Sequence, residues 1–459
     1  MRTSEMVARA LDYVGAWEEA YAPFEPHPSM HVAPEAFDEA LGRYVERLAG
    51  NYPFFHPSYA GQMIKPPHPV AVAAYAAAQS INPNNHALDG GPPTAEMERE
   101  VVAKLAAMLG LPDAHLGHLT TGGTIANLEA LFVARELAPG KAVAFSADAH
   151  YTHARMAHVL GMPTRSVPTD EGGRLDLNAL EDSFRTGEVG TVVVTAGTTG
   201  LGVVDPIADV LPLARRYGVR VHVDAAYGGF FVLLARAGDA ALGAETRRHL
   251  GAVGEADSVA VDPHKHGLQP YGCGAVLFRD PSVGRFYVHD SPYTYFTSEA
   301  LHLGEISLEC SRAGAAAGAL WLTLELLPLE ADRGLGPILA ACLRAARAWH
   351  AAVEGAAYLR PFAAPELDIV TYFPRLGTAS RVDAASAEVF ALAMGSPDPI
   401  FPALFVTPSA RLAALGIAPD VPSARVLRSV LLKPEHETVA PALVARLDAL
   451  ASSVASSAF

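Results

Sequence analysis

Features that define whole classes of protein are scarce in this 459-residue chain. The only three cysteines are Cys273, Cys310 and Cys342, and their wide spacing disfavours a disulfide framework and a zinc site. We expect them to be buried thiols in a reducing cytoplasm. Charged residues make up 18% of the chain, and the net charge of −15 argues against a nucleic-acid partner and an anionic membrane partner. The chain shows no secretory leader pattern and no uninterrupted apolar run of spanning length, so we expect no membrane segment.

Hydrophobic residues, in contrast, make up 50% of the chain. At this length they suffice for two or three domains around a large core. Short β-branched runs alternate with helix-like segments in the middle of the chain. The expected strands are 142–145, 192–194, 220–223, 258–261 and 275–278, and helices are expected at 126–137, 177–184 and 207–217. This alternation predicts an α/β fold with a mostly parallel sheet covered on both faces.

Segments of a different character flank this α/β region. Helices expected at 4–20 and 37–48, with a proline-rich break between them, form an N-terminal arm that has no obvious core of its own. After a long helix beginning near Ser311, the expected elements are a helix at 337–353, strands near 368–373, 403–407 and 426–432, and a helix at 436–450. We therefore expect three parts: an arm at 1–65, a large domain at 66–330 and a small α+β C-terminal domain at 331–459.

Two of the expected strands are followed at their carboxyl ends by side chains that could take part in a reaction. Asp224 ends the run that starts at Val219, and Lys265 follows the strand at 258–261. In open α/β sheets ligands bind outside the carboxyl ends of strands, so the carboxylate and the lysine would face one site. The pair suits pyridoxal phosphate, whose aldehyde forms a Schiff base with a lysine and whose ring nitrogen stays protonated beside an aspartate. Singly, such an aspartate is more often a turn or cap residue, and such a lysine a solvated charge.

A glycine-containing turn at 120–124, Thr-Thr-Gly-Gly-Thr, precedes an apolar helix. A turn of this kind presents unpaired N–H groups and the positive end of the helix dipole, which suits a phosphate. The ordinary alternative is a threonine-capped helix start. The chain lacks the complete Walker and dinucleotide-binding patterns, which disfavours a nucleotide.

The chain resembles the group II pyridoxal-phosphate-dependent decarboxylases, which include aromatic amino acid, tyrosine and glutamate decarboxylases. Five motifs carry the resemblance in the family's order: Thr-Thr-Gly-Gly-Thr-Ile-Ala-Asn (120–127), Ala-His-Tyr (149–151), Gly-Thr-Thr (197–199), Asp-Ala-Ala-Tyr-Gly-Gly (224–229) and Asp-Pro-His-Lys (262–265). It covers roughly residues 50 to 325. It implies the aspartate aminotransferase-like fold type I, the cofactor pyridoxal 5′-phosphate, and a homodimer with active sites at the subunit interface. The implied reaction converts an L-amino acid, aromatic or related, into its amine and CO2 through a Schiff base on Lys265.

The resemblance also implies individual roles. The residues expected to hold the cofactor are Gly123, Thr124, His150, Thr198, Thr199, Asp224, Ala226, His264, Lys265 and, near the phosphate from the second subunit, Ser311. Among the catalytic residues, His150 would stack on the ring and orient the substrate carboxylate, while Asp224 would keep the ring nitrogen charged. A tyrosine of the 286–299 loop would return a proton once CO2 has left.

The preferred proton donor is Tyr293, with Tyr295 close behind, and Tyr287 is a third tyrosine of the same loop. All three could equally be packing residues.

Asn84 and His86 precede the next expected helix, which Thr94 would cap and Gly110 would end. By resemblance, this stretch reaches into the neighbouring subunit's substrate pocket, where relatives with aromatic substrates tend to carry apolar residues. The polar pair therefore puts a simple aromatic pocket in doubt.

Other outcomes remain open on the same cofactor: an aminotransferase, an aldehyde-forming decarboxylase that consumes O2, or a lyase acting on a phosphorylated amino alcohol. The loop tyrosines favour an amine product, because aldehyde-forming relatives tend to replace the loop tyrosine. A non-catalytic protein of the same fold is disfavoured, because Lys265, Asp224 and His150 are all present.

Overall fold

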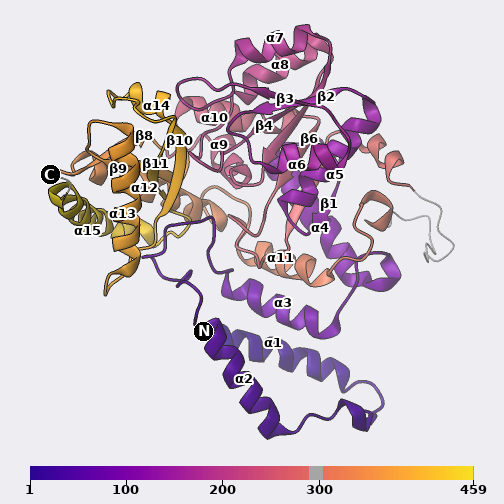
Figure 1. Ribbon diagram of the computed structural model, residues 1–459. Helices are drawn as coiled ribbons and strands as arrows, with labels where there is room; N and C mark the ends of the chain where they lie inside the picture. The colour runs from indigo at the N-terminus through magenta and orange to yellow at the C-terminus, as the bar shows by residue number, and fades with distance from the viewer. Residues whose placement is uncertain (289–302, 458–459) are drawn as a thin grey trace.

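The computed structural model describes residues 1–288 and 303–457. Three parts can be followed in Figure 1: a helical arm at the N-terminus, a large α/β part and a smaller part with its own sheet. The expected fold class, α/β with a mostly parallel sheet, is confirmed.

The large sheet has seven strands in the order β1-β7-β6-β5-β4-β2-β3. Their bounds are β1 Leu116–Thr120, β2 Ala142–Ser146, β3 Thr164–Val167, β4 Val189–Thr195, β5 Arg220–Ala225, β6 Ser258–Val261 and β7 Gly274–Phe278. Of these strands, only β7 runs antiparallel to its neighbours. β1 and β3 were not expected from the sequence; β3 is an edge strand with one buried residue, Val167, and so lacks an apolar pattern.

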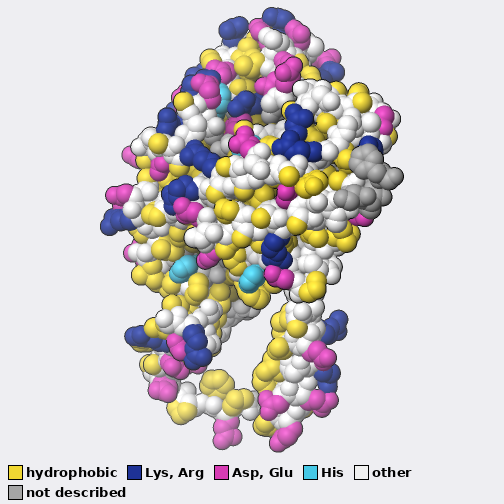
Figure 2. Space-filling model, turned by 90° about the vertical axis from the view of Figure 1, so that its left-hand side faces the viewer, with side chains coloured by type: hydrophobic (Ala, Val, Ile, Leu, Met, Phe, Trp, Pro, Cys, Tyr) yellow, Lys and Arg dark blue, Asp and Glu magenta, His cyan; other side chains and the backbone are white. Residues whose placement is uncertain are grey.

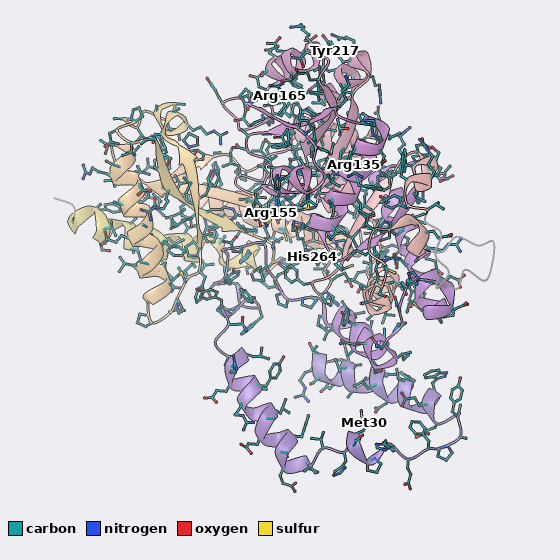
Figure 3. The ribbon with its side chains drawn as sticks, turned by 45° about the vertical axis from the view of Figure 1, so that its right-hand side comes forward. Met30, Arg135, Arg155, Arg165, Tyr217 and His264 are labelled. Atoms are coloured by element: carbon teal, nitrogen blue, oxygen red, sulfur yellow. The ribbon has the colours of Figure 1, made fainter. Side chains whose placement is uncertain are left out.

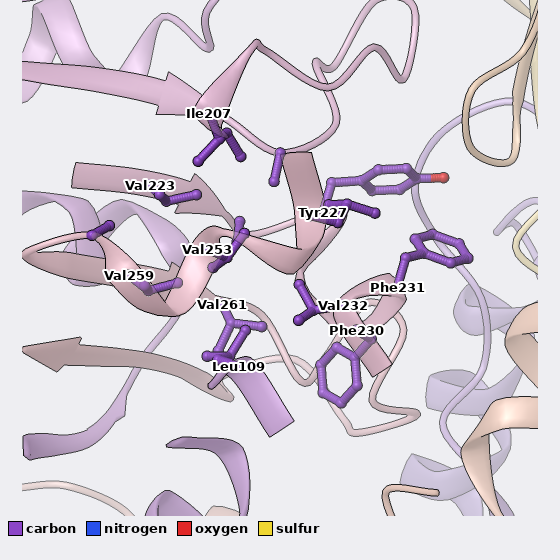
Figure 4. Close-up of a cluster of buried hydrophobic side chains, with 14 of the residues drawn as sticks. Leu109, Ile207, Val223, Tyr227, Phe230, Phe231, Val232, Val253, Val259 and Val261 are labelled. Carbon is purple, nitrogen blue, oxygen red and sulfur yellow. The ribbon is translucent and has the colours of Figure 1, made fainter. Parts of the chain in front are cut away.

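Helices pack against this sheet and close its core. They are α4 Pro92–Leu109, α5 Gly123–Leu137, α6 Thr152–Val159, α7 Leu177–Arg185, α8 Ile207–Tyr217, α9 Val232–Arg236, α10 Ala244–Gly251 and α11 Gly314–Leu326. Figure 4 shows part of the core, where Val223 of β5 and Val259 of β6 lie near Leu109 of α4 and the aromatic turn at Phe230. Their burial fixes the strand ends that carry the polar residues described below.

The expected cap of α4 is wrong, although its expected end is confirmed. The helix begins at Pro92 after Gly91, so Thr94 lies inside the first turn. Its hydroxyl instead donates to Asn85 Oδ1 at 2.7 Å. The helix ends at Gly110, whose φ of +84° is the left-handed conformation that favours glycine.

The smaller part is α+β, as expected, and its sheet is antiparallel. Its strands, in the order β10-β11-β9-β8, are β8 Leu359–Ala363, β9 Ile369–Pro374, β10 Ala403–Pro408 and β11 Ser423–Val430. Its helices are α12 Leu335–Glu354, α13 Ala379–Gly395, α14 Ser409–Ala413 and α15 His436–Ser457. By length and composition α15 could cross a membrane, but Leu443 and Leu447 pack in the core of this part.

The arm contains α1 (Thr3–Glu18) and α2 (Pro34–Leu48), neither of which buries a residue. α1 packs along α3 (Pro69–Ile81), whereas α2 stands away from the body. Figure 2 shows hydrophobic side chains gathered on the arm beside an opening in the molecule. The exposed large hydrophobic residues of α2 recur at helical spacing: Phe37, Leu41, Tyr44, Val45 and Leu48.

Candidate active site

A cavity of about 310 Å³ lies where β4, β5 and β6 end and α5 begins. Eight of the expected site residues line it: Gly123, Thr124, His150, Thr199, Asp224, Ala226, His264 and Lys265. Segments more than 140 residues apart in the chain thus meet at the carboxyl edge of the parallel strands, as the sequence predicted.

Asp224 presents an ionised carboxylate at the end of β5. Its Oδ2 accepts a hydrogen bond from His153 Nε2 at 2.9 Å, and its Oδ1 accepts one from the backbone N–H of Ala226 at 3.1 Å. Burial alone would raise the pKa of Asp224, but the hydrogen bond from His153 and the charge of Lys265 lower that pKa below its usual range. The carboxylate can therefore hold a cationic ring nitrogen throughout the pH range of a folded enzyme.

Lys265 lies on the turn after β6, with its ammonium group 3.0 Å from Asp262 Oδ2. Burial alone would lower the pKa of Lys265, but Asp262 and then Asp224 outweigh it and raise that pKa. The other oxygen of Asp262, Oδ1, is buried and has no hydrogen-bond partner among the described residues. Asp262 therefore positions the lysine and retains one free acceptor facing the site.

The start of α5 forms a backbone cradle. Gly122 has φ +146°, and a Cβ added to Gly123 would lie 2.7 Å from Asp262 Oδ2 and 3.2 Å from the Ala226 side chain. Glycine is thus required for the backbone to approach so closely. The unpaired N–H groups of the first helical turn and the dipole make this the place in the cavity for a phosphate.

Two histidines of the cavity are neutral near pH 7. Burial lowers the pKa of His150 and the pKa of His264. His264 Nδ1 donates to the backbone oxygen of Cys273 at 2.8 Å, and the His150 ring packs against Tyr151 with centroids 4.3 Å apart. Figure 3 shows His264 at the border of the large α/β part that faces the arm.

Four expected residues do not line this cavity. Thr198 is buried, and its hydroxyl accepts from the backbone N–H of Val203 at 3.2 Å, so it shapes the turn after β4 instead of facing the site. Asn84, His86 and Ser311 form a separate cluster: Asn84 Nδ2 donates to Ser311 Oγ at 3.1 Å, and Asn84 Oδ1 accepts from the His86 N–H at 3.1 Å.

The tyrosines of the 286–299 loop divide into two groups. Tyr293 and Tyr295 lie outside the described residues, so their roles stay predictions. Tyr287 is 5% exposed and packs against Phe132 at 5.4 Å between ring centroids. For Tyr287, the packing alternative is the correct one.

Sequence reasoning missed two residues next to the reactive groups. His153 is three residues beyond His150 on α6 and completes the Asp224 pair; an Ala-His-Tyr-Thr-His run was the only signal for it. Asp262 was quoted within its motif but given no role, although its spacing three residues before Lys265 places both on one turn.

A buried polar network links the site to the smaller part. Tyr227, which lines the cavity, donates to Asp368 Oδ1 at 2.5 Å, and His266 Nε2 donates to Asp368 Oδ2 at 2.8 Å. This network fixes the residue after Lys265 against the segment that leads into β9.

Among the described residues, no group of three or more histidine, cysteine, aspartate or glutamate side chains is placed to hold a metal ion. All three cysteines are free. Cys273 and Cys342 are buried as expected, but Cys310 is exposed, so the expectation of three buried thiols is wrong for that residue.

The residues of the cavity fit pyridoxal 5′-phosphate. Asp224 would pair with the ring nitrogen, Lys265 would bind the aldehyde carbon, and the Gly122–Thr124 turn would hold the phosphate. The hydroxyl of Thr195 lines the cavity, is buried and lacks a partner among the described residues, as expected of a group that faces a polar ligand.

Comparison with known proteins agrees with this fit. A family model for the pyridoxal-dependent decarboxylase conserved domain matches residues 54–358. A probable L-tyrosine/L-aspartate decarboxylase of Methanothermobacter thermautotrophicus is 32% identical over 277 residues, or 60% of this chain and 72% of that protein. A probable L-aspartate decarboxylase of Halobacterium salinarum is 36% identical over 289 residues, or 62% of this chain and 77% of that protein. The structure of Oryza sativa TDC with PLP and tryptamine has a TM-score of 0.79 at 20% identity and covers 97% of both chains.

The sheet order and the site together define a fold type I enzyme that depends on pyridoxal phosphate. Within that class, the chain belongs to the pyridoxal-dependent decarboxylase family. It is accordingly an amino acid decarboxylase with pyridoxal 5′-phosphate as its cofactor.

Proposed function

We propose that this enzyme removes CO2 from an L-amino acid, aromatic or related, and releases the amine. The observation that carries the proposal is that Lys265, Asp224 and the α5 cradle converge on one cavity of cofactor size. When bound there, the cofactor supplies an electron sink for the bond that breaks at Cα.

Residues of the chain itself stabilise the charged ring, orient the substrate and return the proton. Asp224, held ionised by His153, stabilises positive charge on the ring nitrogen. His150, whose pKa is lowered by burial, presents a neutral imidazole that orients the substrate carboxylate. A phenol of Tyr293 or Tyr295 returns a proton to Cα, which is what yields an amine instead of an aldehyde.

The proposal includes a homodimer whose sites lie at the subunit interface. Two observations support it: the exposed apolar residues of α2, from Phe37 to Leu48, and the Asn84–His86–Ser311 cluster, which does not line the cavity of its own subunit. Helices with an uncovered apolar face normally bury it against a partner. We also propose a cytoplasmic location, in keeping with the three free thiols.

The test is to incubate the protein, supplied with pyridoxal 5′-phosphate, with single amino acids and to analyse the products by mass spectrometry. The proposal predicts an amine from at least one amino acid. Aldehyde or keto acid without amine would contradict the decarboxylase-to-amine function while leaving the cofactor site intact. Failure of every amino acid in the panel would contradict the activity itself.

A further inference from the structure

The residue that follows Lys265 is a histidine buried in a polar network. The ring of His266 is fully buried and contacts the rings of Tyr227 and Phe231, in each case with centroids 4.7 Å apart. Its Nδ1 lies 2.9 Å from the backbone oxygen of Tyr227, and its Nε2 lies 2.8 Å from Asp368 Oδ2. His266 therefore joins the turn that carries Lys265 to a carboxylate of the smaller part.

The partners of His266 determine how many protons this network holds. A backbone carbonyl can only accept a hydrogen bond, and so can an ionised carboxylate. A neutral imidazole has a single N–H, so it cannot donate to both of these partners. Oδ1 of Asp368 already accepts a hydrogen bond from the Tyr227 hydroxyl at 2.5 Å. The network thus needs one proton more than a neutral histidine and a carboxylate carry together.

This additional proton lies on His266. Asp368 is fully buried, and burial alone would raise its pKa, but the charge and hydrogen bond of His266 and the hydrogen bond of Tyr227 lower that pKa. The charges of Arg428, on β11, and of Lys65 also interact with this carboxylate. Asp368 is therefore ionised, and His266 is an imidazolium.

The network connects the smaller part to a cavity that this part does not line. None of the described residues that line the cavity belongs to the smaller part. Tyr227 does line the cavity, and its phenol oxygen points out of the hydrophobic cluster (Figure 4). Asp368, which receives that hydroxyl, directly precedes β9, and its backbone oxygen accepts from the N–H of Leu431 at 2.8 Å. The carboxylate is thus held by two strands of the smaller sheet.

The turn that carries Lys265 is packed too closely to move in pieces. A Cβ added to Gly267 would lie 2.6 Å from Phe230 Cζ and 2.7 Å from Pro263 Cα. The backbone N–H of Lys265 also donates to the oxygen of Asp262 at 2.9 Å within the same turn. Displacement of the residue after Lys265 therefore displaces the lysine as well.

We infer that Asp368 and His266 are positioning residues for the cofactor, and that their ion pair holds the Lys265 turn in place from the smaller part. Neither residue lines the cavity, so both act through Lys265 and Tyr227. A buried ion pair is costly to break from one side, because the remaining charge has no partner, whereas neutral groups in place of the charges cost little. The pair therefore predicts a characteristic rescue.

The test is a double-mutant cycle that measures the dissociation constant of pyridoxal 5′-phosphate. His266→Phe keeps an aromatic ring but leaves the Asp368 charge unpaired, and should weaken cofactor binding about tenfold or more. Asp368→Asn lets a neutral His266 satisfy every hydrogen bond, and should stay within about threefold of the wild type. Addition of Asp368→Asn to His266→Phe should restore most of the lost affinity. Asp398→Asn, at an exposed carboxylate of the smaller part, is the matched control.

Nuclear magnetic resonance of the cofactor-bound enzyme, labelled with nitrogen-15 in its histidine rings, tests the charge directly. The ring signal of His266 is identified as the one that Asp368→Asn alters. It should show a proton on both ring nitrogens in the wild type and on one nitrogen in Asp368→Asn. This comparison substitutes no histidine, so it also tests the inference where His266→Phe does not fold.

Three results would overturn the inference. Affinity in the double variant as low as in His266→Phe would show that the histidine acts by packing alone. Unchanged affinity in His266→Phe would show that Arg428 or Lys65 neutralises Asp368 without it. A neutral His266 ring in the wild type would place the proton on Asp368 and remove the ion pair. Each of these results would leave the decarboxylase function standing.

Discussion

His153 Nε2 lies 2.9 Å from Asp224 Oδ2, and both side chains are buried. The pair explains how a carboxylate that burial would otherwise protonate remains charged at the end of β5. His153 is thus a positioning residue, because it acts on the cofactor site through Asp224. Its other ring nitrogen, Nδ1, is buried and unpaired within the described part of the chain.

Replacement of His153 tests this relationship. His153→Gln should lower kcat about tenfold or more, because Asp224 loses the partner that holds its pKa down. Asp224→Asn should lower kcat further, by about 100-fold or more, because it removes the charge itself. The specific readout is the pH titration of the cofactor's absorption, which should shift in His153→Gln. A titration identical to that of the wild type would contradict the positioning role.

The α5 cradle predicts a steric effect on cofactor affinity. Gly123→Ala places a Cβ 2.7 Å from Asp262 Oδ2, so the turn must shift. We expect the dissociation constant for pyridoxal 5′-phosphate to rise about tenfold or more. Gly395→Ala, where an added Cβ meets nothing within 4 Å, is the control. Equal affinity of the two variants would show that α5 does not hold the phosphate.

His222 predicts part of the acid sensitivity. Its ring is buried between Ser258 Oγ at 2.9 Å and Asn127 Oδ1 at 2.8 Å, and burial lowers its pKa to about 3. The unfolded chain binds a proton at this residue near pH 6.5, so stability falls as the pH drops from there toward 3. At pH 5, unfolding of the wild type should take up about one more proton than unfolding of His222→Asn. An equal uptake measured by titration would contradict the lowered pKa.

The exposed face of α2 predicts how the subunits associate. The double substitution Leu41→Glu and Val45→Glu puts two charges on that face, and should shift the protein from dimer toward monomer in sedimentation experiments. Glu46→Gln, a polar exchange on the same helix, should leave the mass unchanged. A wild-type monomer, or a dimer indifferent to the double substitution, would contradict a role for the arm.

The sequence was most informative where local pattern and topology act together. Buried strands such as β5 and β6 have β-branched runs, and the end of each places Asp224 and Lys265 at the same edge of the sheet. The edge strand β3 has a single buried residue, Val167, and so carried no pattern to recognise.

The sequence could not predict which way a side chain points or which residues far apart in the chain form a pair. The threonines of the Gly-Thr-Thr turn look alike in sequence, but only Thr199 faces the cavity, because Thr198 accepts a hydrogen bond within its own turn. His153 and Asp224 are 71 residues apart, and only the packing of α6 brings them together. The helix cap expected at Thr94 failed because Gly91 and Pro92 start α4 earlier.

The most direct test of the account is to reduce the protein with borohydride after cofactor binding and to locate the modified peptide by mass spectrometry. A lysine attacks an aldehyde in its uncharged form, which a lower pKa makes more abundant. The lysine pKa values alone would therefore favour attachment of the cofactor to Lys433, whose pKa burial lowers to about 8, over attachment to Lys265, whose pKa is raised. The account predicts that the cofactor is attached to Lys265, because Asp224 and the α5 cradle hold it there. Attachment to Lys433 or another lysine, or no attachment, would contradict the central claim.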